Sequence, residues 1–122
     1  MQTPFYAVVA ADPQVQNLLG NPARVYPWGE NTDKPVRYPY VTFQLVGGAP
    51  EEVLSGRSKV DEGTLQVDVW AETAASARQV LAALRDAVEP KCRITSWRGE
   101  GKDPETKRYR TGFDCRWTVI RP

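Results

Sequence analysis

Residues 63–89 read GTLQVDVWAETAASARQVLAALRDAVE, and a change of periodicity within this stretch decides the fold. The first part alternates strictly, so Leu65, Val67 and Val69 lie on one face of a predicted strand. Trp70 and the polar residues between these positions lie on the other face. Such alternation is typical of a strand that has one buried face and one wetter face.

The second part of the stretch has the spacing of an amphipathic helix. Its apolar stripe consists of Ala77, Val80, Leu81, Leu84 and Val88. Thr73 stands where an N-cap belongs, because its hydroxyl can accept from amides of the first turn, and Pro90 stops the helix. The strand and the helix each have one apolar face, so we expect the helix to pack across the sheet that contains the strand.

The rest of the chain adds further strands and an N-terminal helical region. Residues 4–19 have helical spacing interrupted at Asp12-Pro13, which predicts either two short helices or one kinked helix. Further strands are predicted at residues 24–27 (very short), 39–46, 92–97 and 109–120. In the second of these, Val41, Phe43 and Leu45 are expected to face inward.

Three polar stretches separate these elements and are predicted to be loops: residues 28–38, 49–59 and 99–107, the last of them a mobile, hairpin-like loop. The predicted order is therefore α-β-β-β-α-β-β. This order indicates an α+β fold with two helical segments on a mainly antiparallel sheet of four to five strands. We expect residues 1–122 to form a single domain.

Charge and hydropathy narrow the possible partners. The chain has 16 Lys and Arg against 15 Asp and Glu, well mixed, for a formal net charge of +1. This balance argues against an electrostatically driven nucleic-acid or membrane partner as the main function, although the segment after residue 90 is locally basic. No apolar run approaches membrane-spanning length, so no membrane partner is expected.

The residue types that commonly carry catalysis are scarce. The chain has no histidine, which removes the commonest general base and the Ser-His-Asp and Cys-His pairings. Cys92 and Cys115 fall on different predicted strands, and we expect two buried, reduced thiols in a cytoplasmic compartment. Neither a structural zinc site nor a disulfide scaffold is expected from two cysteines.

Two other patterns that can carry chemistry have ordinary structural explanations. The adjacent acids Glu51-Glu52 and Asp61-Glu62 lie in or beside predicted loops and, as neighbours, make poor acid–base pairs. The glycine-containing residues 47–50 and 99–102 are predicted to be turns, because neither stretch lies between a strand and a helix N-terminus. We therefore predict no catalytic, cofactor or metal site.

The tryptophans are candidates for an interface. Trp70 lies on the second face of its predicted strand, Trp97 is expected to face away from Ile94, and Trp28 lies in a loop. Large aromatics on the second face of a sheet indicate that this face is covered, either by the chain's own first helix or by another subunit. Stacking of single-stranded nucleic acid is disfavoured by the near-neutral charge and by the lack of an aromatic cluster on one strand.

The order of several motifs carries a resemblance to a known family. The motifs are LLG at residues 18–20, RVYP at 24–27, YPYVTF at 38–43, QVDVWA at 66–71, and the helix with Ala77, Val80 and Leu84. In this order they resemble the tail completion, or tail terminator, proteins of long-tailed bacteriophages and prophages, which include the tail-to-head joining proteins. The resemblance spans nearly the whole chain, although the three loops carry no motif of the family.

The resemblance implies a structural protein of the virion that has no enzymatic activity and no cofactor. Such a protein is expected to form a ring, a homohexamer, that caps the tail tube and ends its polymerisation. The implied partners are further copies of itself, the tail tube protein, and a head connector or head-completion protein. The implied location is the head–tail interface of the virion, with the host cytoplasm as the place of assembly.

The loops and tryptophans are then the candidate contact sites. The candidate interface residues are Trp28, Glu51, Glu52, Arg57, Lys59, Trp70, Trp97, Lys102, Lys107 and Arg108. Residues 49–59 and 99–108 are expected to contact neighbouring rings, because long polar loops can order when they meet a partner. The basic loop is an alternative contact for DNA that passes through the lumen. Another head-completion or assembly component, and a small enzyme, are the alternative functions.

Overall fold

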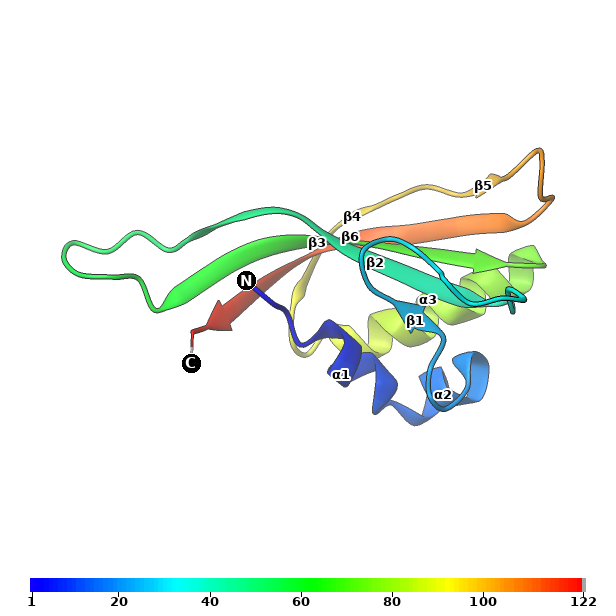
Figure 1. Ribbon diagram of the computed structural model, residues 1–122, viewed down its shortest axis with the longest axis horizontal. Coiled ribbons are helices and arrows are strands. Elements are labelled where there is room, and N and C mark those ends of the chain that lie inside the picture. The colour runs from blue at the N-terminus through cyan, green and yellow to red at the C-terminus, as the bar shows by residue number, and fades with distance from the viewer. Residues whose placement is uncertain (122) are drawn as a thin grey trace.

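A mixed sheet with helices on one face forms the structure, a computed structural model that describes residues 1–121 (Figure 1). Three helices and six strands are found within these residues. They are α1 (Phe5–Ala10), α2 (Pro13–Leu19), β1 (Val25–Tyr26), β2 (Tyr40–Pro50), β3 (Val60–Ala71), α3 (Ala74–Val88), β4 (Arg93–Trp97), β5 (Gly101–Lys102) and β6 (Tyr109–Ile120). The predicted α+β class is confirmed.

The sheet has the strand order β1-β2-β3-β6-β4, with β5 paired to β6. Every pairing is antiparallel except that of β1 with β2, so the sheet is mixed and has six strands rather than four to five. The predicted order lacked β5, which is two residues long and too short to show alternation. Two separate N-terminal helices are present, because Asp12 Oδ1 caps α2 by accepting from the amides of Gln14 and Val15.

The strand and helix of residues 63–89 form the centre of the core, as predicted. Leu65, Val67 and Val69 of β3 are buried on the face that α3 covers, and α1 packs against α3. The Thr73 hydroxyl accepts from the Ser76 amide at 3.1 Å, which confirms the predicted N-cap. The buried part of the helix stripe consists of Ala77, Val80, Ala83, Leu84 and Val88, whereas Leu81 is partly buried.

Strands β2 and β3 continue beyond the helices as a long hairpin, which we call the arm (residues 45–64; Figure 1). The prediction of a turn at residues 47–50 is wrong, since these residues belong to β2 and follow an irregularity in register between Leu45 and Gly47. A Cβ at Gly48 would lie 2.2 Å from the carbonyl oxygen of Glu62, so glycine permits the close approach of the two strands.

The loop of the arm is consequently shorter than predicted and spans residues 51–59. Asp61 and Glu62 lie within β3 rather than in a loop. Leu45 shares a face with its buried cross-strand partner Leu65, yet Leu45 is 47% exposed. Leu45 therefore points to the face of the helices, as predicted, but it is not buried. The helices end before the arm begins, so no helix covers this position (Figure 1).

The prediction that Trp97 faces away from Ile94 is also wrong. The register of β4 on β6 shifts between Ile94 and Ser96, so Ile94 opposes Cys115 and Trp97 opposes Phe113. Such a bulge adds one residue and returns the next side chains to the same face. Trp97 therefore lies on the side of the helices, where the Arg85 guanidinium of α3 is 5.0 Å from its ring centre.

Candidate assembly surfaces

The face of the sheet opposite the helices carries an ion-pair network at its centre. Arg98 Nε donates to Asp68 Oδ1 at 2.9 Å, and Arg98 Nη1 donates to Asp114 Oδ1 at 3.4 Å. Gln66 Nε2 donates to Asp68 Oδ2 at 3.0 Å, and Ser96 donates to Asp114 Oδ2 at 2.8 Å. These bonds join β3, β6 and the end of β4, and they give the second face a rigid polar centre.

A row of aromatic rings lies beside this network. Tyr40 of β2 stacks on Trp70 of β3, with ring centres 6.2 Å apart and an interplanar angle of 19°. Tyr38 and Tyr26 approach the Tyr40 ring at 5.3 and 6.2 Å. Burial and a hydrogen bond to the Asp33 carboxylate raise the pKa of Tyr26 to about 12. The row is therefore a set of half-buried rings that support one another.

Arginine guanidinium groups cover the two ends of the aromatic row. Arg108 lies 4.8 Å from the ring centre of Tyr38, and Arg110 lies 6.0 Å from that of Trp70. Cations placed over aromatic faces in this way are attracted by the ring quadrupole. The sequence suggested no aromatic cluster, because its members come from three strands and a loop.

Trp70 does not lie under the chain's own first helix. Its neighbours in β3, Val69 and Ala71, point to the helices and are buried, whereas Trp70 points to the opposite face. Of the two explanations that the sequence left open, the first is therefore wrong. Tyr40 and Arg110 cover part of the Trp70 ring, and the rest of it faces solvent in this structure.

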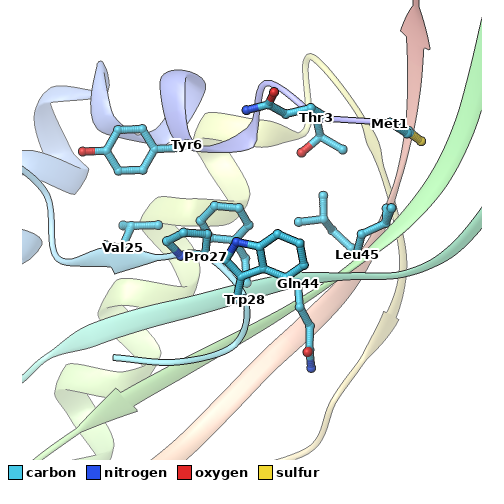
Figure 2. Close-up of a pocket in the computed structure, with 11 residues that line it drawn as sticks. Met1, Thr3, Tyr6, Val25, Pro27, Trp28, Gln44 and Leu45 are labelled. Atoms are coloured by element: carbon cyan, nitrogen blue, oxygen red, sulfur yellow. The ribbon is translucent and has the colours of Figure 1, made fainter. Parts of the chain in front are cut away.

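An apolar groove lies at the base of the arm, on the side of the helices, and has a volume of about 810 Å³ (Figure 2). Segments from four separate parts of the chain meet there. Its apolar and aromatic lining consists of Met1, Tyr6, Val25, Pro27, Trp28, Phe43, Leu45 and Leu65. In Figure 2 Tyr6 lies across the groove from Pro27 and Trp28, whereas Gln44 points away. Trp28 is 88% exposed, so its ring forms an open wall.

The predicted interface residues are placed in several separate regions. Four of them, Glu51, Glu52, Arg57 and Lys59, lie exposed in the loop of the arm. Trp28 lies at the groove, Trp70 and Arg108 lie in the aromatic row, and Trp97 lies on β4 at the far edge of the sheet. The structure therefore brings Trp70 and Arg108 together through Tyr38 and Tyr40. Lys102 also lines one hollow with Trp70, whereas Trp28, Trp97 and the loop of the arm lie apart from them.

The other two predicted residues lie in the β5–β6 hairpin, Lys102 in β5 and Lys107 in the loop that follows it. Lys102 lies 5.3 Å from the ring centre of Tyr109, and Lys107 is exposed at a positive φ of 61°. Asp103 organises this loop, because its Oδ1 accepts from the amides of Glu105 and Thr106. The predicted hairpin-like loop is confirmed, because β5 pairs antiparallel with β6. The predicted turn at residues 99–102 is wrong, since residues 101 and 102 form β5 and the turn lies at residues 104–106.

The two thiols lie together on the core side of the sheet. Cys115 is buried and Cys92, which precedes β4 and is not part of a strand, is half-buried; both are free. The pKa of Cys115 is raised, mainly by a hydrogen bond with the Cys92 thiol and to a smaller extent by burial. Cys115 is therefore a poor nucleophile, whereas the hydrogen bond with Cys115 lowers the pKa of the half-buried Cys92.

Neither the arm nor the groove was predicted from the sequence. Val53 and Leu54 form an apolar pair inside an otherwise polar stretch, and this pair was a usable signal for the exposed tip of the arm. The groove had no comparable signal, because its walls come from the N-terminus, residues 25–28, β2 and Leu65 of β3, which are far apart in the sequence. None of the helices within residues 1–121 is long and apolar enough to span a bilayer.

The fold and these surfaces define an α+β protein that presents apolar side chains on an extended arm and in an open groove. Such surfaces suit assembly with other protein chains. Residues 3–120 match the family described as "Tail completion protein gp17". The chain belongs to this family of structural virion proteins, and it is a structural component of phage tails.

A solved structure supports the fold independently. The chain is similar to one in a structure described as "Virion of native gene transfer agent (GTA) particle", with a TM-score of 0.65 and 17% sequence identity. The likeness covers 95% of this chain and 91% of that chain. At this identity it shows the shared fold alone. No curated protein matches the sequence.

Proposed function

We propose that this protein forms a homohexameric ring that caps the finished tail tube, ends its polymerisation and provides the surface to which the head is joined. The observation that carries the proposal is the family match over residues 3–120. The ring acts in the virion, at the head–tail interface, after assembly in the host cytoplasm. Residues 1–122 act as one domain in this ring.

A cap of this kind needs one surface for its own copies and others for the tube and the head. The groove and the arm offer surfaces of different shape at different places on the chain, as a head-to-tail ring requires. The aromatic row with Trp70 and Arg108 lies on the opposite face of the sheet and is free for a second partner. The polar residues of the segments 49–59 and 99–108 contact the neighbouring rings, whereas the apolar tip of the arm at Val53 and Leu54 serves contacts between copies in one ring.

The basic loop is a further proposed contact, for DNA that passes through the lumen of the ring. Lys102 and Lys107 are exposed there, and Arg108 is half-buried against Tyr38. Such a contact is weak and independent of sequence, because it rests on phosphate charge. A triple variant, Lys102→Gln, Lys107→Gln and Arg108→Gln, that supports full infectivity would refute this contact without affecting the capping proposal.

The proposal is tested by adding the purified protein to polymerising tail tube protein and measuring tube lengths by electron microscopy. A cap binds only tube ends, so amounts far below the molar amount of tube protein are expected to stop elongation. Bovine serum albumin at the same concentration is the control for non-specific effects. Unchanged elongation at a molar excess of the protein would contradict the proposal and favour a head-completion role.

A further inference from the structure

We propose that the tip of the arm, at Val53 and Leu54, inserts into the apolar groove of an adjacent copy of this chain. This inference rests on the proposed ring and specifies how its copies hold one another. Every copy gives one arm tip and receives one. The contact thus joins two surfaces that the isolated chain leaves open.

The arm tip exposes apolar side chains in a polar setting. Leu54 is fully exposed and Val53 is 52% exposed, and both lie in the loop between β2 and β3. Transfer of such side chains from water to an apolar site is favourable, because it removes apolar surface from water. The exposed apolar side chains of the tip are therefore suited to insertion into an apolar pocket.

The groove has the complementary character. Tyr6, Phe43 and Leu45 supply apolar surface. Pro27 and Trp28 lie across the groove from Tyr6 (Figure 2). Beyond Thr42 the outer edge of β2 pairs with no strand among residues 1–121, although the Gly29 amide donates to the Phe43 carbonyl at 2.9 Å. An open strand edge beside an apolar groove offers backbone groups as well as side chains to an incoming segment.

Charge is distributed unevenly around the tip, because the exposed Glu51 and Glu52 precede it and two basic residues follow it. Arg57 and Lys59 follow the tip, and Glu30 lies beside the groove, where its amide approaches the Pro27 carbonyl at 3.4 Å. All three side chains are exposed and have no ion-pair partner within the described residues. An arm seated in the groove brings basic residues towards this acidic rim, which favours one orientation of the tip.

The arm cannot reach the groove of its own chain. A strand rises about 3.3 Å per residue, so Pro50 at the end of β2 lies roughly 16 Å beyond Leu45, and the tip lies further still. Figure 1 shows the arm pointing away from the helices. Folding back would break the pairing of β2 with β3, which continues to Pro50 opposite Asp61. The occupant is therefore the arm of a second copy.

A contact between an arm tip and a distant groove is heterologous, and such a contact forms a closed ring when the rotation between copies closes. In such a ring the number of tips equals the number of grooves, so neither surface stays exposed. A tail tube protein on the groove would instead leave every arm tip in water. This difference favours another copy of the chain as the partner.

Disulfide trapping tests the inference. The full-length chain carries Leu54→Cys and Tyr6→Cys in a Cys92→Ser background, and Cys115 remains buried. Mild oxidation is expected to produce a ladder of covalent oligomers, because each copy contributes one cysteine at the tip and one in the groove. Thr3→Cys in place of Tyr6→Cys provides a second pair within the same groove. Trapping accumulates even transient contacts, so it does not depend on the resting oligomeric state.

The matched control pairs Leu54→Cys with Gln79→Cys, which is exposed on α3 and away from the groove. A ladder at least fivefold stronger for both groove pairs than for this control supports the inference. An equal yield, no ladder, a product that stops at a dimer, or trapping only to added tube protein overturns it. Glu30→Lys is expected to lower the yield at least threefold, and Arg57→Glu in the same chain to restore it; no effect of either also overturns the inference.

The native mass of the wild-type protein separates this inference from the ring itself. A wild-type mass of six chains without a trapped ladder refutes the contact between arm and groove and leaves the ring intact. A ladder together with normal tube elongation would support the contact and contradict the capping function. The two proposals therefore fail in different experiments.

Discussion

Arg98 donates from Nε to Asp68 Oδ1 at 2.9 Å across the centre of the face that carries no helix. The side chains are 25% and 13% exposed, respectively. Removal of one partner from such a pair leaves a poorly solvated charge. We expect Arg98→Met to lower the free energy of unfolding by about 2 kcal/mol, measured by urea denaturation.

The matched control for that measurement is Arg78. It pairs with Glu100 at 2.7 Å, and both side chains are exposed to solvent. We expect Arg78→Met to leave the urea midpoint unchanged, because exposed ion pairs contribute little. Equal midpoints for the two variants would show that the central network does not stabilise the sheet.

Gly112 permits the close packing of β6 on β3. A Cβ at this position would lie 2.0 Å from the Val67 carbonyl oxygen, and this backbone atom cannot move without disturbing the central strand. We expect Gly112→Ala to cost about 1–3 kcal/mol of stability. Gly47→Ala, which meets no atom within 4 Å, is expected to retain the wild-type midpoint in the same assay.

Tyr26 makes the stability depend on alkaline pH. Its pKa rises from 10.0 to about 12, because burial and the bond to Asp33 favour the neutral phenol in the folded state. This contribution is complete below pH 10 and is lost as the pH rises towards 12. We expect the stability of the wild type to fall relative to Tyr26→Phe over this range, by denaturant titration; parallel curves would contradict the assignment.

The loop of the arm is expected to matter for assembly and not for folding. Deletion of residues 55–59 removes exposed or half-exposed residues outside the core, so the melting temperature is expected to change by no more than about 2 °C. Phage that carry this deletion are expected to yield at least tenfold fewer particles with heads joined to tails. Normal yields by electron microscopy would refute a role for this loop in contact between rings.

Local patterns explain which parts of the fold could be predicted. The strand and helix of residues 63–89 follow from periodicity, and the caps at Asp12 and Thr73 follow from side chains next to the helices that they start. The fold class could be predicted and the family motifs recognised for the same reason. These features depend on neighbours in the sequence.

Some side-chain directions and burials could not be predicted, because they depend on β-bulges and on where the helices stop covering the sheet. The register shift beside Ile94 turns Trp97 to the helices, and the shift after Leu45 lets β2 continue through Gly48. Leu45 alternates as an inward residue, but periodicity does not reveal where the helices end. The aromatic row at Trp70 was hidden because its rings meet only across strands.

The measurement that tests the central claim most directly is the length of tails in a lysate of the phage that lacks this gene. Electron microscopy is expected to show tails of irregular, excessive length without heads. Wild-type protein supplied from a plasmid is expected to restore uniform length and joined heads. Tails of uniform length in the deletion lysate, with or without heads attached, would contradict the claim that this protein ends tail polymerisation.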